Sequence, residues 1–250
     1  MSKRIVIFLL SAVYIFAGKV CAQESNEENT VISSVDSASD AEYREAKALF
    51  MGGEYEQAAK IYSHIIAERP SPAAYNDRGS CYRKLGRLDD ALADYTEAIR
   101  RRPCAIYYCN RGSVHYKMED FDAAISDYTI ALAFDTAYYQ ALNNRGIVFL
   151  NTGSDRRAAD DFTACIRMKP NHYLVYNNRG IAYYKLKEFE KSLADFNRVV
   201  ELKPDYGIAY LHRGNIREML DDDAGACADW TKAAAMGVKQ AESCLKNCKD

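Results

Sequence analysis

Small, aromatic and polar residues recur along this chain every 33 or 34 residues, and five of these recurrences carry an Arg-Gly pair. The pairs are Arg78-Gly79, Arg111-Gly112, Arg145-Gly146, Arg179-Gly180 and Arg213-Gly214. Counted from each glycine, a small residue follows after 12 positions and an aromatic residue after 16. The aromatic residues are Tyr95, Tyr128, Phe162, Phe196 and Trp230. A fixed period in this range predicts stacked pairs of α-helices.

The pattern resembles the tetratricopeptide repeat, in which small residues occupy positions eight and twenty and an aromatic residue lies near position twenty-four. Here position eight is the glycine of each pair, or Ala46 in an earlier repeat without the pair. The resemblance implies an all-α fold, a right-handed superhelical solenoid of antiparallel helix pairs. Six repeats are expected at about 39–71, 72–104, 105–138, 139–172, 173–206 and 207–240. A capping helix is expected over 238–250, because the last repeat would otherwise expose its apolar face.

Each arginine of the Arg-Gly pairs is followed by an aspartate 16 residues later. The resulting pairs are Arg78/Asp94, Arg111/Asp127, Arg145/Asp161, Arg179/Asp195 and Arg213/Asp229. The first repeat has Glu45 and Ile61 there and so lacks both members. We predict structural ion pairs, within a repeat or between neighbours, that fix how the helices stack. The alternative is that the five arginines hold an acidic ligand.

By the same resemblance, positions five, six, twelve and thirteen of each first helix line a concave groove. Polar residues are frequent at positions five and six, and the candidate ligand-binding residues there are Asn76, Asp77, Asn110, Asn143, Asn144, Asn177, Asn178 and His212. Positions twelve and thirteen add Tyr116, Tyr184, Lys84, Lys117 and Lys185. An asparagine side chain offers both a donor and an acceptor, so one per repeat can pair with an extended backbone.

A similar asparagine ladder occurs in the helical repeats of the O-linked N-acetylglucosamine transferases. We therefore predict that the groove binds an extended peptide of acidic or aromatic character, since lysines and tyrosines flank the amides. The alternative is that asparagine simply suits this helix position in common repeat sequences.

The first 22 residues have the pattern of an export signal. Lys3 and Arg4 precede an apolar run over 5–18, which is shorter than the roughly 20 residues of a membrane span. Val20-Cys21-Ala22 then resembles a signal-peptidase site. We expect cleavage after Ala22, a periplasmic or extracellular location and no membrane span in the mature chain. Lipid attachment at Cys21 fits poorly, because the residues before it are Lys19 and Val20.

Composition and charge narrow the function further. The 250 residues are 48% apolar, which is typical of a folded chain. The 33 basic and 35 acidic residues give a net charge of −2, which does not favour nucleic-acid binding. Residues 23–40 hold five acidic and no basic residues, and 23–38 is rich in Ser, Asn and Glu. We expect 23–38 to be a flexible acidic tether.

The positions of the cysteines predict a disulfide at the C-terminal end. Cys227 lies in the last repeat and Cys244 and Cys248 in the expected capping helix, and an oxidising compartment permits disulfides. We predict a Cys227–Cys248 bridge, with Cys227–Cys244 as the alternative. Cys81 and Cys165 are interpreted as packed thiols, and Cys104 and Cys109 could bridge only outside a helix. No metal site is predicted, because the three C-terminal cysteines lack a fourth ligand.

The sequence contains no G-x-S-x-G, P-loop or H-E-x-x-H motif and so predicts no enzyme and no cofactor. The interpretation is a noncatalytic protein- or peptide-binding scaffold or adaptor outside the cytoplasm. Two alternatives stay open: an accessory of envelope assembly or secretion machinery, and an enzyme-regulating module. The sequence predicts neither the partner's identity nor the oligomeric state.

Overall fold

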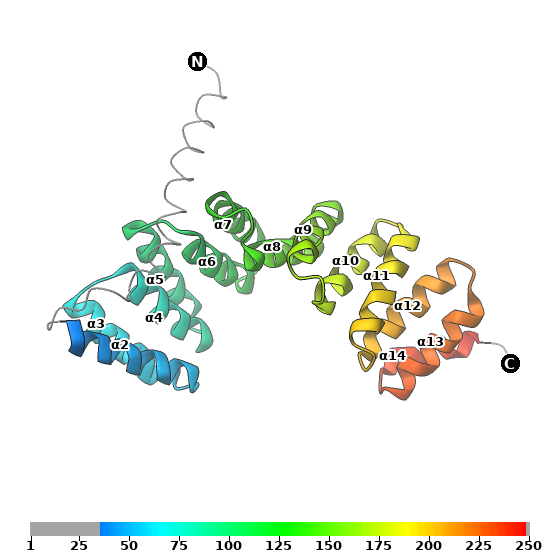
Figure 1. Cartoon of the computed structure of the whole chain (residues 1–250), viewed down its shortest axis with the longest axis horizontal. Helices are drawn as coiled ribbons and strands as arrows, with labels where there is room; N and C mark the ends of the chain where they lie inside the picture. The colour runs from blue at the N-terminus through cyan, green and yellow to red at the C-terminus, as the bar shows by residue number, and fades with distance from the viewer. Residues whose placement is uncertain (1–35, 249–250) are drawn as a thin grey trace, which may run out of the picture. The chain divides into compact units, whose positions relative to one another are not determined.

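The computed structural model describes residues 36–248, and every regular element in that range is a helix (Figure 1). The helices are α2 (Asp36–Met51), α3 (Tyr55–Glu68), α4 (Pro72–Lys84), α5 (Leu88–Arg101), α6 (Ala105–Lys117), α7 (Phe121–Phe134), α8 (Tyr139–Asn151), α9 (Asp155–Met168), α10 (Tyr173–Lys185), α11 (Phe189–Leu202), α12 (Gly207–Met219), α13 (Asp223–Ala235) and α14 (Lys239–Cys244), followed by the 3-10 turn η1 (Leu245–Asn247). The expected all-α fold of consecutive helix pairs is confirmed.

The chain forms two compact units that meet between Ala141 and Leu142, near the start of α8. In the first unit each helix from α2 to α7 packs on the next along the chain. In the second unit the same neighbour-to-neighbour packing runs from α9 to α14, and α8 is joined to α9 by an ion pair. The pairs α2–α3 through α12–α13 are the six repeats. The repeat pattern itself carries no signal for the division into two units.

The glycine at position eight lets the two helices of a repeat approach closely. A Cβ added at these glycines would lie 3.1 Å from the ring of Tyr95, 3.0 Å from Tyr128, 2.8 Å from Phe162, 2.7 Å from Phe196 and 2.6 Å from Trp230. Each of these aromatic side chains is at most 2% exposed. In the first repeat Ala46 takes the same position, beside buried Tyr62. The aromatic ring therefore fills the space that the missing side chain leaves.

Two expected boundaries need correction. Helix α2 begins at Asp36, so residues 36–38 are helical and do not belong to the tether expected over 23–38. Within the described residues the C-terminal cap is not one continuous α-helix as expected over 238–250: α14 spans Lys239–Cys244, and the 3-10 turn η1 continues to Asn247.

Residues 1–35 lie outside the described range. The expected signal peptide, Cys21 and most of the expected tether fall there. Among the helices of residues 36–248, none is both long and apolar enough to cross a bilayer.

Candidate functional site

Hydrogen bonds between polar side chains connect the first helices of the first unit. Asn110 on α6 donates through Nδ2 to Oδ1 of Asn76 on α4, over 2.8 Å. Asn76 donates to Oδ1 of Asp77 over 2.9 Å, and the Tyr43 hydroxyl on α2 donates to the other carboxylate oxygen. We call Tyr43, Asp77, Asn76 and Asn110 the polar chain. It links three successive repeats through the first helix of each, which are α2, α4 and α6.

Asp77 is the charged member of the polar chain, and its environment disfavours that charge. Burial raises the pKa of the carboxyl, and the hydrogen bonds from Tyr43 and Asn76 oppose this rise without cancelling it. The surroundings are largely aromatic, since Tyr43 meets the buried ring of Tyr62 edge-on with centroids 5.4 Å apart. At this position the first repeat carries Arg44, and the later repeats carry Asn110, Asn144, Asn178 and His212.

Basic and aromatic side chains flank the polar chain. Lys84 and Lys117 are exposed at position thirteen of α4 and α6. Tyr116 is half-buried at position twelve, and its ring tilts against Phe121 with centroids 6.0 Å apart. This edge of the first unit therefore combines positive charge with aromatic surface.

The second unit repeats the amide pattern. Asn143 donates to Asn144 over 3.4 Å, and Asn177 donates to Asn178 over 3.3 Å. Tyr184 is 39% exposed, and Lys185 donates to the carbonyl of Leu150 over 2.9 Å. His212 lies against Phe196 with centroids 5.2 Å apart, and burial lowers the pKa of its imidazole.

Two of the three asparagines at position five are buried, which corrects the expected double row of ligand-binding amides there; Asn143 is half-buried. Asn76 and Asn177 are only 6% and 7% exposed, and their amides donate to the residue at position six. Position five lies closer to the packed helix interface, and Cys109 there is likewise buried. The half-buried side chains at position six are Asp77, Asn110, Asn144, Asn178 and His212. These are the groups that can reach a ligand.

Each arginine–aspartate pair joins the two helices of one repeat. The arginine donates through Nε and one terminal nitrogen to both carboxylate oxygens, over 2.6 to 2.9 Å. The pairs are Arg78/Asp94, Arg111/Asp127, Arg145/Asp161, Arg179/Asp195 and Arg213/Asp229. The aspartates are 4–8% exposed and the arginines 15–21%. These guanidinium groups already have partners, which argues against the alternative of an acidic ligand.

The remaining terminal nitrogen of the arginine reaches the preceding repeat. Its acceptors are Ser63 for Arg78, Thr96 for Arg111, Thr163 for Arg179 and Asn197 for Arg213, over 3.0 to 3.3 Å. A tyrosine three residues before the arginine also lies against the guanidinium, with its ring centroid 5.3 to 5.7 Å from the guanidinium carbon. These tyrosines are Tyr75, Tyr108, Tyr176 and Tyr210. Neither set was among the predicted contacts, although both sets of residues recur with the period of the repeat. One arginine thus couples two repeats.

Position eleven places a further nitrogen-bearing side chain beside two of these aspartates. Arg217 donates to Asp229 over 2.8 Å, and His115 lies 3.8 Å from Asp127.

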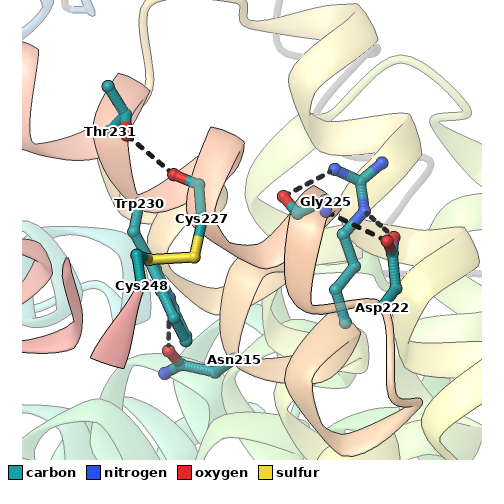
Figure 2. Close-up of a disulfide and its surroundings, with 8 residues drawn as sticks. Asn215, Asp222, Gly225, Cys227, Trp230, Thr231 and Cys248 are labelled. Atoms are coloured by element: carbon teal, nitrogen blue, oxygen red, sulfur yellow. Dashed lines mark hydrogen bonds and ion pairs between the residues drawn. A yellow bond between two sulfur atoms is a disulfide. The ribbon is translucent and has the colours of Figure 1, made fainter. Parts of the chain in front are cut away.

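The C-terminal end is held by a disulfide between Cys227 on α13 and Cys248 after η1 (Figure 2). Trp230, one turn from Cys227, donates to Asn215 over 2.9 Å. Cys244, the alternative partner, keeps a free thiol, 4.0 Å from Oδ1 of Asn215. The bridge closes the end of the second unit over the core around Trp230.

The other described cysteines are buried and lie outside any disulfide, namely Cys81, Cys104, Cys109 and Cys165. Cys104 precedes α6 and Cys109 lies within it. Burial raises the pKa of Cys81, Cys109 and Cys165 to about 12, so these thiols stay protonated near neutral pH and are poor nucleophiles. Within residues 36–248, no three His, Cys, Asp or Glu side chains gather closely enough to hold a metal ion.

Profiles of the tetratricopeptide repeat match residues 40–71, 72–103, 109–173 and 173–206, which together span more than half of the chain. Among solved structures, the C-terminal part of a TPR repeat-containing protein from Cytophaga hutchinsonii is 27% identical, with a TM-score of 0.68 and 78% of each chain covered.

Two more distant structures share the fold. YrrB, described as a TPR protein with an unusual peptide-binding site, is 18% identical, with a TM-score of 0.69, over 76% of this chain and all of its own. Pseudomonas aeruginosa pilF is 18% identical, with a TM-score of 0.70, over 80% of this chain and 92% of its own. A comparison with curated proteins found no match.

Proposed function

Because the chain belongs to the tetratricopeptide-repeat family, we propose that it is a noncatalytic scaffold or adaptor that binds an extended peptide along its first helices. Folds of this family are generally noncatalytic repeat scaffolds that mediate protein–protein interaction. YrrB, which has the same fold, is itself described as having a peptide-binding site.

The observation that carries the proposal is the recurrence of half-buried amides at position six, in Asn110, Asn144 and Asn178. Asn110 and Asn178 each follow a buried residue of the same helix, Cys109 and Asn177, so packing fixes their backbone positions. A primary amide can donate to a peptide carbonyl and accept from a peptide N–H. One amide per repeat therefore suits a ligand whose backbone is extended and whose side chains vary.

The flanking residues indicate the character of the ligand. Lys84 and Lys117 add positive charge to the first unit, and Tyr116 and Tyr184 add aromatic surface. Exposed lysines attract acidic side chains, and tyrosine rings offer contact area at a low cost in conformational entropy. We therefore expect acidic and aromatic residues among those of the bound peptide.

We further propose that the protein works outside the cytoplasm. The support is the positively charged and apolar start of the sequence, the cleavage pattern at 20–22, and the disulfide at the C-terminal end. The mass of the purified native protein tests this directly. A mass corresponding to residues 23–250 is expected, and a full-length mass in the cytoplasmic fraction would contradict it.

Peptide binding is tested by replacing the position-six amides together, as Asn110→Ala/Asn144→Ala/Asn178→Ala. The probe is an array of terminally blocked random nonapeptides. The triple variant should lose most of the bound peptides while its helicity, measured by circular dichroism, stays unchanged.

A matched control removes three exposed amides outside the first helices, as Gln57→Ala/Asn171→Ala/Gln240→Ala. This control should bind like the wild type. Equal binding by both triple variants would mean that the position-six amides are ordinary helix composition.

A further inference from the structure

Asp77 differs from the other aspartates that lie between the helices. The side chains of Asp94, Asp127, Asp161, Asp195 and Asp229 each form a two-pronged ion pair with an arginine. Asp77 forms no ion pair with any residue of 36–248, and its hydrogen bonds come from the neutral groups of Tyr43 and Asn76. A partly desolvated carboxylate without a cation is destabilised, so its presence needs a reason.

The residues at position six of later repeats show that a charge is not needed there for packing. The residue at position six is a neutral asparagine in the next three repeats, and asparagine would occupy the same volume at Asp77. The donors Tyr43 and Asn76 hold the two carboxylate oxygens at fixed orientation. A carboxylate has about four lone-pair sites, so these two bonds leave capacity for further donors.

No cation of the protein fills that capacity in the described range. The groups whose charge interacts with Asp77 come from each helix around it: Lys47 on α2, Tyr62 on α3, Cys81 on α4 and Tyr95 on α5. Lys47 is the cation among them; it is exposed, and it acts less strongly on Asp77 than the two hydrogen bonds do. The stretch 23–35, which precedes α2, contains no lysine or arginine.

We propose that Asp77 is the anchor for a cationic nitrogen of the bound peptide, either a lysine or arginine side chain or a free amino terminus. The inference rests on the proposed peptide-binding function and names one contact of that site. The ligand would then carry a cationic group at the second repeat and acidic groups toward the lysines at position thirteen. Opposite charges in that order would fix the register and direction of the peptide on the first unit.

The test compares four pools of nonapeptides with random uncharged residues. Three pools are blocked at both termini and carry lysine, arginine or norleucine at the centre. The fourth has a norleucine centre and a free amino terminus, which separates the terminal amine from the side-chain cations. Affinities are measured for the wild type, for Asp77→Asn and for Asp160→Asn, a control with the same change of charge at an exposed site on α9.

The wild type and Asp160→Asn should bind at least one cationic pool about tenfold more tightly than the blocked norleucine pool, as expected for one charge-assisted contact. Asp77→Asn should bind all pools like norleucine. A cationic preference that survives in Asp77→Asn, or one that is absent in the wild type, overturns the assignment while peptide binding stands. A wild type that binds no pool overturns the proposed function as well.

A second measurement does not depend on the variant. The carboxyl carbon of Asp77 can be followed by 13C NMR through a pH titration of the wild type, with and without the lysine peptides. A bound cation should lower the apparent pKa of this carboxyl, because it stabilises the ionised form. An unchanged titration at saturating peptide would overturn the proposal.

Discussion

At the scale of single residues, the glycines of position eight set how closely the two helices of a repeat pack. An added Cβ has least space at Gly214. It would lie 3.1 Å from the ring of Tyr95 at Gly79, but only 2.6 Å from the ring of Trp230 at Gly214. The Trp230 ring is also held in place by its hydrogen bond to Asn215. Substitution should therefore be tolerated unequally along the chain, although every repeat carries the same motif.

We expect Gly214→Ala to lower the free energy of unfolding by about 1–2 kcal/mol, because overpacking outweighs the better helix propensity of alanine. Gly79→Ala is the matched control, in which the two effects should nearly cancel. Urea denaturation followed by circular dichroism measures both variants. A Gly214→Ala protein as stable as the wild type would show that the Trp230 ring can move aside without lowering the free energy of unfolding.

His212 makes stability depend on pH. Burial lowers the pKa of its imidazole in the folded state below the ordinary value of 6.5, so the unfolded chain takes up a proton first as pH falls. The histidine therefore favours unfolding as pH drops from that value toward the folded pKa, and it has no such effect above pH 7. His212→Asn, with the residue of three other repeats, should lose less stability between pH 7.5 and pH 5.5 than the wild type. Equal losses in thermal melts at the two pH values would contradict this.

The sequence predicted the arginine–aspartate partners, because both members appear or disappear together across six repeats. It did not predict the polar chain. The pairing of Tyr43 with Asp77 depends on which rotamers the side chains adopt across a helix interface. The burial of Asn76 and Asn177 was missed for a related reason: a one-position step along a helix turns a side chain by about 100°, from the surface toward the neighbouring helix.

At the scale of the helix, the ion pairs couple the two helices of a repeat. In Arg179/Asp195 the carboxylate is 5% exposed and accepts two hydrogen bonds from the guanidinium. Such a pair adds little when compared with an apolar pair, but removing one partner leaves a buried charge alone. The arginine also lies against Tyr176 and Tyr183, so its planar shape matters as well as its charge.

Arg179→Ala should lower the free energy of unfolding by about 3 kcal/mol, because Asp195 would be left without a counter-ion. The double variant Arg179→Ala/Asp195→Ala should regain part of that loss. Arg179→Lys tests geometry separately, since lysine keeps the charge but cannot form the two-pronged contact. The measurement is equilibrium urea unfolding of all three. If Arg179→Ala were as stable as the double variant, the isolated charge of Asp195 would have no cost, and the predicted role of the ion pair would be wrong.

At the scale of the whole molecule, neighbour-to-neighbour packing explains what could be read from the sequence. Each helix contacts mainly the helices next to it along the chain, so a period in the sequence is enough to predict the fold. The division between Ala141 and Leu142 is not predicted by this period, because the same repeat motif occurs on both sides of it.

The same locality predicts where loss of the disulfide is felt. Cys248→Ser opens a loop with a sequence separation of 21 residues, which should lower the stability of the C-terminal end by about 3 kcal/mol on the loop-entropy model. Hydrogen exchange should become faster in α12 to α14 and stay unchanged in α2 to α5. Cys244→Ser, which removes a free thiol nearby, is the control. Faster exchange throughout the chain would contradict the local coupling.

The backward contact of each arginine bears on how an array of this kind can change its length. Arginine and acceptor belong to adjacent repeats but recur with the same period, as Ser63, Thr96, Thr163 and Asn197 show. Thr231 stands at the equivalent place in the last repeat, where its hydroxyl bonds to its own helix. A tandem duplication of one repeat would therefore copy both halves of the contact, and the new junction would match the old ones. A duplication would keep the arginine–acceptor contact intact at every junction. The number of repeats can therefore change more easily than the residues that form the interface between repeats.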